Sequence, residues 1–255
     1  MTHRPAILVL LTATAAAAMP GAASAYTLKR TETGAVVHWR QGEVRFRVGD
    51  CEGIDRADVE RAAEIAADAW RGFPGVPDIA IVRGDPGAMG YRGDGRDING
   101  IYLLPEWPFR DRHLAVTAST HDVPTGQIVD TDILINGEMP FSLMNEGRPA
   151  RRRYDLASVL AHEMGHVLGL GETDQEGATM WPRTRRGQVD QRTLETDDEE
   201  GVLAIYGPGG EAASLDAGCS ISSLASPGTD IRFLAIALVL GLFAVRRRRA
   251  PCQRG

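Results

Sequence analysis

The most informative stretch of the sequence is His162-Glu163-Met164-Gly165-His166-Val167-Leu168-Gly169. An α-helix turns about 100° per residue, so two histidines four residues apart lie on one helix face, within about 6 Å of each other, and can hold one metal ion. Glu163 follows the first histidine and can accept a proton from a water molecule bound to that metal. The pattern His-Glu-x-x-His is therefore typical of a zinc hydrolase, with Glu163 as the general base.

The residues after the second histidine extend this pattern. A glycine at position 169 can adopt a left-handed conformation that ends the helix and turns the chain back. Glu172 then comes within reach of the metal as a third ligand. Asp174 is a competing ligand on the same turn, and Glu172 can also face solvent while water fills the third position.

This pattern resembles that of the metzincin metallopeptidases, His-Glu-x-x-His-x-x-Gly-x-x-His followed by a methionine turn. Glu172 stands where that family has its third histidine. Among metzincins the matrixins, with an M10-type catalytic domain, are most similar, because Tyr154 to Ala161 leads into His162 much as their active-site helix begins. Ala178-Thr179-Met180-Trp181-Pro182 resembles the methionine turn, and Asp197 to Gly207 resembles the closing matrixin helix.

The resemblance implies an α/β (α+β) fold with a twisted mixed five-stranded sheet, packed helices including the active-site helix, and a small C-terminal subdomain. It also implies a zinc-dependent endopeptidase that acts on a peptide or protein substrate. The expected roles are zinc ligation by His162, His166 and Glu172, general-base catalysis by Glu163, support beneath the ligands by Met180, and lining of the specificity pocket by Trp181 and Pro182.

The two ends of the chain indicate export. Residues 1–25 combine a basic start, an apolar run from Ala6 to Ala18 and the small-x-small sequence Ala23-Ser24-Ala25, as in a cleaved secretory signal peptide. We therefore expect a mature start at Tyr26 and a catalytic domain over residues 26–207. An uncleaved anchor is the alternative, which the weakly hydrophobic alanine-rich run disfavours.

The C-terminal part predicts retention in the cell envelope or on the cell surface. Residues 208–230 form a linker that contains Cys219, residues 231–249 combine a short apolar span with four arginines, and residues 250–255 form a cytoplasmic tail. This arrangement resembles the MYXO-CTERM sorting tails of myxobacterial exported proteins, which implies processing near Cys219 by a sorting protease and contact with the membrane. A simple tail anchor is the alternative.

Charge and cysteine usage argue against a nucleic-acid-binding protein and against a domain stabilised by internal disulfides. From Tyr26 to Gly218 there are 21 basic and 33 acidic residues, which disfavours nucleic acid as a partner. Cys51 is the single thiol of residues 26–207, so no internal disulfide is possible there. We interpret Cys51 as a small loop or core residue and expect a monomer.

Hydrophobic periodicity predicts the order of helices and strands. The strand over residues 127–136 resembles the metzincin edge strand, with which an extended substrate pairs in that family. Asp55, Asp155 and Thr196 are predicted to cap the three helices. The other expected elements are an opening strand over 36–48, strands over 78–82, 98–104 and 113–119, and helices over 56–71, from 156 and from 197.

Calcium (Ca²⁺) is a second candidate cation. The loop from Gly84 to Gly95 is rich in glycine, aspartate and proline, and matrixins bind calcium nearby. Asp132 can bind calcium or cap a turn, and the sequence favours neither role.

Two further functions remain open at this stage. The chain can be a non-catalytic binding protein whose site has decayed at Glu172, or a structural surface protein whose fold retains zinc. Retention of Glu163 argues against decay, because only catalysis needs a base at that position.

Overall fold

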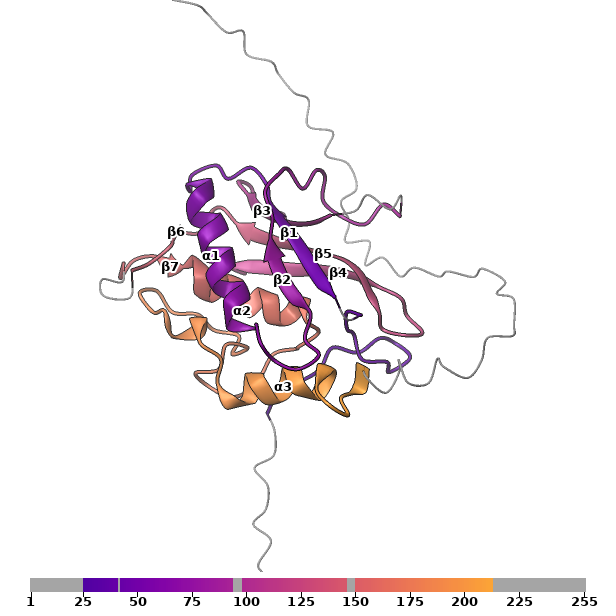
Figure 1. The fold of residues 1–255 in the computed structure, drawn as a ribbon. Coiled ribbons are helices and arrows are strands. Elements are labelled where there is room, and N and C mark those ends of the chain that lie inside the picture. Colours follow the sequence, from indigo (N-terminus) through magenta and orange to yellow (C-terminus); the bar gives the residue numbers. More distant parts are fainter. Residues whose placement is uncertain (1–24, 41, 94–97, 146–149, 213–255) are drawn as a thin grey trace, which may run out of the picture.

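The computed structural model describes residues 25–40, 42–93, 98–145 and 150–212 (Figure 1). Apart from Ala25, the predicted signal peptide lies outside this part of the chain. The same is true of the predicted tail, with Cys219 and residues 231–249. Within the described residues, no helix is both long and apolar enough to cross a membrane.

Five strands form one sheet in the order β2-β1-β3-β5-β4. The strand β4 runs antiparallel to β5, whereas the other neighbours are parallel, so the sheet is mixed. This arrangement confirms the predicted α/β fold. The strands are β1 (Glu43–Val48), β2 (Asp78–Ile81), β3 (Asn99–Leu104), β4 (Ala115–His121) and β5 (Ile128–Asn136), and a separate pair is formed by β6 (Phe141–Ser142) and β7 (Tyr154–Asp155).

The predicted edge role of residues 127–136 is wrong. The strand β5 pairs with both β3 and β4, and all but one of its nine side chains are buried. Its sequence carries the apolar run Ile133-Leu134-Ile135, which suits a strand covered on both faces and not an edge. The edge at this side of the sheet is β4. The predicted opening strand is also shorter than expected, because residues 36–38 make isolated bridges and only β1 joins the sheet.

Two helices pack against each other and against the sheet. Helix α1 (Arg56–Ala69) is capped by Asp55, and α2 (Leu156–Val167) is capped by Asp155, as predicted. Trp70, at the end of α1, is fully buried and donates its indole N–H to the carbonyl of Ala161 at 2.9 Å. This contact holds the two helices at a fixed distance in the middle of the core.

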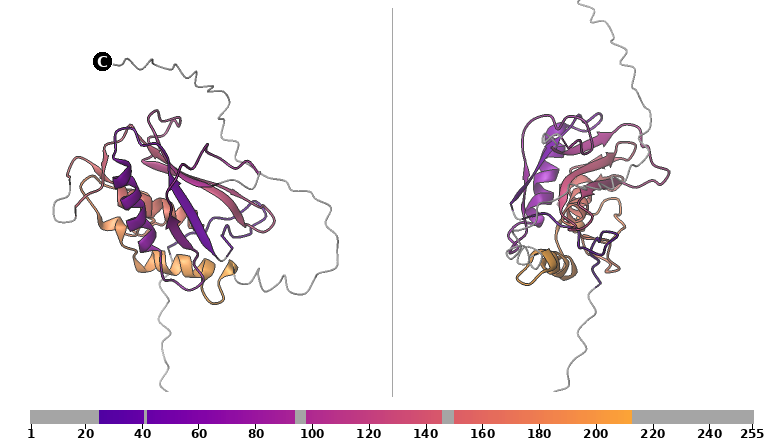
Figure 2. Two further views of the ribbon diagram at one scale, coloured as in Figure 1. Left: turned by 45° about the horizontal axis from the view of Figure 1, so that its top comes forward. Right: turned by 90° about the vertical axis from the view of Figure 1, so that its right-hand side faces the viewer.

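The last helix, α3 (Thr196–Tyr206), begins one residue earlier than predicted, because Glu195 and not Thr196 is the N-cap. Asp198 accepts the backbone N–H of Glu195 at 2.9 Å, which completes a capping box around Glu195. Figures 1 and 2 show α3 and the segment before it, with the short 3-10 helix η1 (Asp190–Arg192), beneath α2 at one end of the molecule.

A buried ion pair connects this lower segment to the start of α2. The guanidinium of Arg192 binds both carboxylate oxygens of Asp155, each at 2.7 Å, and also the carbonyl of Met144 at 2.7 Å. Asp155 is fully buried and also accepts N–H groups from Met144 and Ser158. One carboxylate therefore caps the active-site helix and anchors two loops to it.

We predict that Arg192→Ala destabilises the domain by about 3 kcal/mol, because it leaves the buried carboxylate of Asp155 without its cation. Urea denaturation of the metal-free protein measures this change. Arg185→Ala is the matched control, since Arg185 pairs with Glu176 on the surface, where both side chains are more than two-thirds exposed. Equal stability of the two variants would contradict the structural role of the buried pair.

Candidate metal centre

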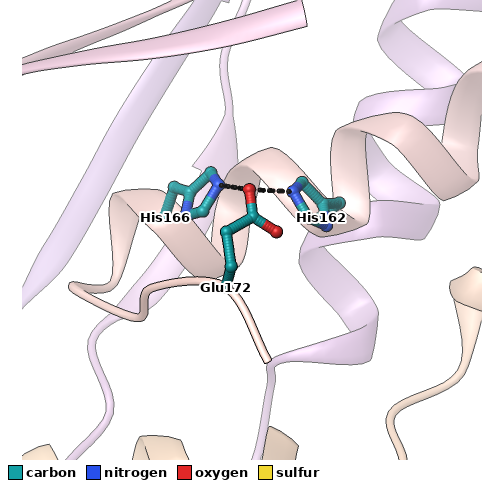
Figure 3. A group of neighbouring side chains, drawn as sticks. All are labelled: His162, His166 and Glu172. Carbon is teal, nitrogen blue, oxygen red and sulfur yellow. Dashed lines mark ion pairs between the residues drawn. The ribbon is translucent and has the colours of Figure 1, made fainter. Parts of the chain in front are cut away.

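Both histidines of the motif lie on one face of α2, and their side chains are 13% exposed (Figure 3). The Nδ1 atom of His162 lies 2.8 Å from the carbonyl of Thr179, and that of His166 lies 2.9 Å from the carbonyl of Leu170. A carbonyl oxygen only accepts, so each Nδ1 carries the proton. In the neutral imidazole each Nε2 therefore keeps a lone pair for a metal, which is the usual arrangement of a metal-binding histidine, whereas in the protonated imidazole Nε2 faces the carboxylate of Glu172 as a donor.

Gly169 reverses the chain after the helix, as predicted. Its φ of +97° lies in the left-handed region. A Cβ atom at this position would lie 2.0 Å from the carbonyl oxygen of Val37, so both conformation and space demand glycine. The reversal brings Glu172 back over the face that carries His162 and His166.

Glu172 converges with the two histidines. Its Oε1 lies 3.6 Å from Nε2 of His162 and 3.5 Å from Nε2 of His166 (Figure 3). In a tetrahedral zinc site with bonds of about 2.0–2.1 Å, ligand atoms are about 3.4 Å apart. The two distances from the carboxylate match this spacing, and the ligand atoms of all three residues lie within 4.8 Å of one another. The donor set of two imidazoles and one carboxylate fits zinc in its chemistry.

These three residues are also the one group of potential metal ligands that the described residues bring together. Asp174, the competing ligand in the sequence, is exposed and lies outside the group. No second cluster of three histidine, cysteine, aspartate or glutamate side chains occurs in the described part of the chain. Asp132 instead uses its two carboxylate oxygens to accept the backbone N–H groups of Gly90 and Gly100, each at 2.7 Å.

The charges of the site are interdependent. Burial alone would raise the pKa of Glu172, but hydrogen bonds with His162 and His166 outweigh it and lower this pKa to about 2. Burial likewise opposes the charged form of His162, yet Glu172 and Glu163 raise the pKa of His162 above its usual value. The pKa of His166 is lowered by burial and by the charges of Lys29 and His162. Glu172 is therefore an anion at neutral pH, as a metal ligand must be.

A cavity of about 560 Å³ opens beside this group. Glu163 lines it and is itself 5% exposed, with Oε2 accepting a hydrogen bond of 2.7 Å from the hydroxyl of Thr117. Of the two residues expected to line the specificity pocket, Pro182 lines this cavity. Trp181 lines a separate cavity of about 210 Å³, on the other side of the same segment.

Met180 is buried beneath the helix, as the resemblance implied. A Cβ atom at Gly165 would lie 2.2 Å from its sulfur and 2.8 Å from the ring of Trp70. Residues 178–182, here called the methionine segment, are held by Asp198, which accepts the N–H groups of Thr179 and Met180 at 2.7 and 2.9 Å. The carbonyl of Thr179 in turn accepts the Nδ1–H of His162. Asp198 of α3 therefore helps to orient this histidine through residues 179–180.

Thr117 and Lys29 are among the cavity-lining residues that were not predicted from the sequence. Thr117 belongs to β4, whose position at the edge was not predicted. The Nζ atom of Lys29 lies 3.5 Å from the carbonyl of His166. Burial lowers the pKa of Lys29 to about 8, against the charges of Glu163 and Glu172, which raise it. The one available signal for Lys29 was its rarity, since it is the single lysine of the chain.

Comparison with known proteins agrees with this geometry. Residues 106–207 match the family model of the matrixin peptidases. The chain is 30% identical to interstitial collagenase of Oryctolagus cuniculus and 36% identical to neutrophil collagenase of Homo sapiens, over 67% and 66% of its length. It is 41% identical to metalloendoproteinase 1-MMP of Arabidopsis thaliana over 34% of its length.

The chain spans 33% of each of these two collagenases and 26% of the plant protein. The matched region contains α2, the methionine segment and α3. Residues 106–207 of this chain are therefore similar to the matrixin peptidases.

We predict that Glu172→Ala weakens zinc binding at least about a hundredfold, because it removes the one anionic member of the group. Asp174→Ala is the matched control and is expected to leave the zinc dissociation constant unchanged. A competition titration with a chromophoric chelator measures both. The reverse order of the two effects would identify Asp174 as the ligand.

Proposed function

We propose that this matrixin-like domain is a zinc-dependent endopeptidase, with zinc held by His162, His166 and Glu172 and with Glu163 as the general base. The observation that carries this proposal is the convergence of the Glu172 carboxylate on both imidazoles, at 3.5 and 3.6 Å, beside the buried carboxylate of Glu163. Zinc bound there would lower the pKa of a water molecule to about 7 and polarise the peptide carbonyl.

Glu163 is well arranged to take a proton. The Thr117 hydroxyl donates to Oε2 and fixes the plane of the carboxylate. No described residue donates a hydrogen bond to Oε1, so this oxygen remains to accept the proton of the attacking water. The same proton is then available for the amine that leaves when the peptide bond breaks.

The position of β4 at the edge of the sheet favours an extended peptide as the substrate. Leu114, Ala115, Val116 and Thr117 line the cavity along this edge, opposite the side of β4 that pairs with β5. An extended peptide can add to such an edge through main-chain hydrogen bonds. Because an added strand continues in both directions past the metal, this mode suits cleavage within a chain.

Glu172 in place of a histidine motivates the rival function, a binding protein that retains zinc without catalysis. Zinc content and cleavage of a general protein substrate such as casein, measured on one preparation, separate the two. Stoichiometric zinc with no cleavage over a range of pH would favour the binding protein.

We also propose that the protein is exported and held at the cell envelope. The support is the signal-peptide pattern of residues 1–25 and the arrangement of Cys219, a short apolar span and four arginines near the other end. In this proposal a sorting protease cleaves near Cys219, and the domain acts outside the cytoplasm. Calcium binding by this domain is also a proposal, and its support is the resemblance to matrixins alone.

We predict that Glu163→Ala leaves zinc bound and lowers kcat by at least about a hundredfold, because general-base assistance contributes that much. Metal analysis and the hydrolysis of a fluorogenic peptide measure the two quantities. Thr117→Val is a graded control, which keeps the carboxylate but removes its orienting hydroxyl, and its kcat should fall by less. Full activity of the Glu163→Ala variant would refute the mechanism.

A separate prediction concerns Cys219. If the tail is a sorting signal, Cys219→Ala should block its removal, and the envelope fraction should contain a larger species. Mass spectrometry of the wild-type protein from the same fraction is the reference. An intact wild-type C-terminus through Gly255 would instead indicate a plain tail anchor.

A further inference from the structure

Lys29 is the single lysine among the 28 basic residues of the chain, and the other basic residues are arginines. It lines the active-site cavity together with Glu163, Glu172 and both histidines. A lysine carries a compact point charge on a flexible stem, whereas arginine presents a broad planar fork. The one position where this chain uses lysine is thus beside its metal centre.

The backbone fixes Lys29 against the loop that carries Glu172. The N–H of Lys29 donates to the carbonyl of Gly169 at 2.8 Å, and its own carbonyl accepts the N–H of Val37 at 2.8 Å. Two residues earlier, the hydroxyl of Thr27 donates to the carbonyl of Glu172 at 2.6 Å. The segment that carries Lys29 and the turn that carries Glu172 therefore hold a constant relative position.

The charge of Lys29 is directed at the metal centre. Its Nζ atom donates to the carbonyl of His166, and no described carboxylate lies within ion-pair distance of it. Burial lowers the pKa of Lys29 to about 8, and the charges of Glu163 and Glu172 oppose this shift, so the ammonium form predominates at pH 7. The neighbouring Arg30 differs, because it is exposed and forms an ion pair with Glu211 on the surface.

The ligand set explains why a cation is useful there. Three neutral imidazoles leave the full double charge of zinc, whereas two imidazoles and one carboxylate leave a single positive charge. A less positive metal is a weaker Lewis acid and lowers the pKa of its water by less. Replacement of a histidine by Glu172 thus removes one unit of charge at the place where catalysis needs it.

We propose that Lys29 is a positioning residue of the metal centre, whose ammonium restores the unit of positive charge that Glu172 removes. It acts through the metal and does not touch the substrate. This inference rests on the proposed function, because it requires zinc at His162, His166 and Glu172.

The proposal predicts two effects of opposite kinds when the charge of Lys29 is removed. Zinc should bind about tenfold more tightly, because a nearby cation no longer repels it. At neutral pH kcat should fall about tenfold, because the metal becomes a weaker Lewis acid, while KM changes little. A loss of structure would instead weaken zinc binding and slow turnover together.

The experiment compares the full-length protein with Lys29→Met, Lys29→Arg and Arg30→Met. Lys29→Met removes the charge at nearly constant volume, Lys29→Arg keeps the charge, and Arg30→Met removes an adjacent charge that points elsewhere. Zinc dissociation constants come from chelator competition, and kcat and KM come from peptide hydrolysis. Thermal unfolding of the metal-free proteins verifies that each variant folds.

Tighter zinc binding in Lys29→Met alone, with a lower kcat and an unchanged KM, supports the proposal. Weaker zinc binding in Lys29→Met would overturn it in favour of a structural role. Unchanged zinc binding with a raised KM would overturn it in favour of a direct substrate contact. The zinc measurement needs no peptidase activity, so failure of the proposed function and failure of this inference are distinguishable.

Discussion

The reversal of the chain at Gly169 is the constraint on which the metal centre depends. The carbonyl of Val37 occupies the space in which any side chain at this position would lie. The turn brings Glu172 back to the histidines, and the carbonyl of Gly169 accepts the N–H of Lys29. A single left-handed residue thus places both the proposed third ligand, Glu172, and the neighbouring cation, Lys29, which are far apart in the sequence.

His162 is in turn oriented from below, by residues 178–180. Asp198 binds two N–H groups of the methionine segment, and the carbonyl of Thr179 in that segment selects the tautomer of His162. The buried pair of Asp155 and Arg192 connects the same lower part to the start of α2. Residues 178–206 thus support His162 and the start of α2, although they contribute none of the three proposed ligands.

The parts of this site that follow from local sequence were predictable, and those that follow from tertiary packing were not. Helical spacing predicts the two histidines, and the glycine predicts the turn that brings Glu172 close to them. The edge position of β4 depends on strand order, which the sequence leaves open, so Thr117 was missed and residues 127–136 were misplaced. The position of Trp181 outside the main cavity likewise depends on the path of a loop.

The exchange of a histidine for Glu172 has two consequences that arise from the same negative charge. Three imidazoles in a metal-free site have no mutual attraction, whereas the carboxylate of Glu172 lies 3.5 and 3.6 Å from the two Nε2 atoms and attracts a histidine that is protonated, which lowers the pKa of Glu172 to about 2. The carboxylate therefore holds the ligands together before a metal arrives, which reduces the ordering that metal binding requires. The same charge would make a bound metal less acidic, and a cation placed beside the site would restore the acidity at the expense of some metal affinity. Lys29 meets that requirement because it belongs to a different segment of the chain. Its Nζ atom contacts the backbone carbonyl of His166 and not the side chain of any of the three proposed ligands.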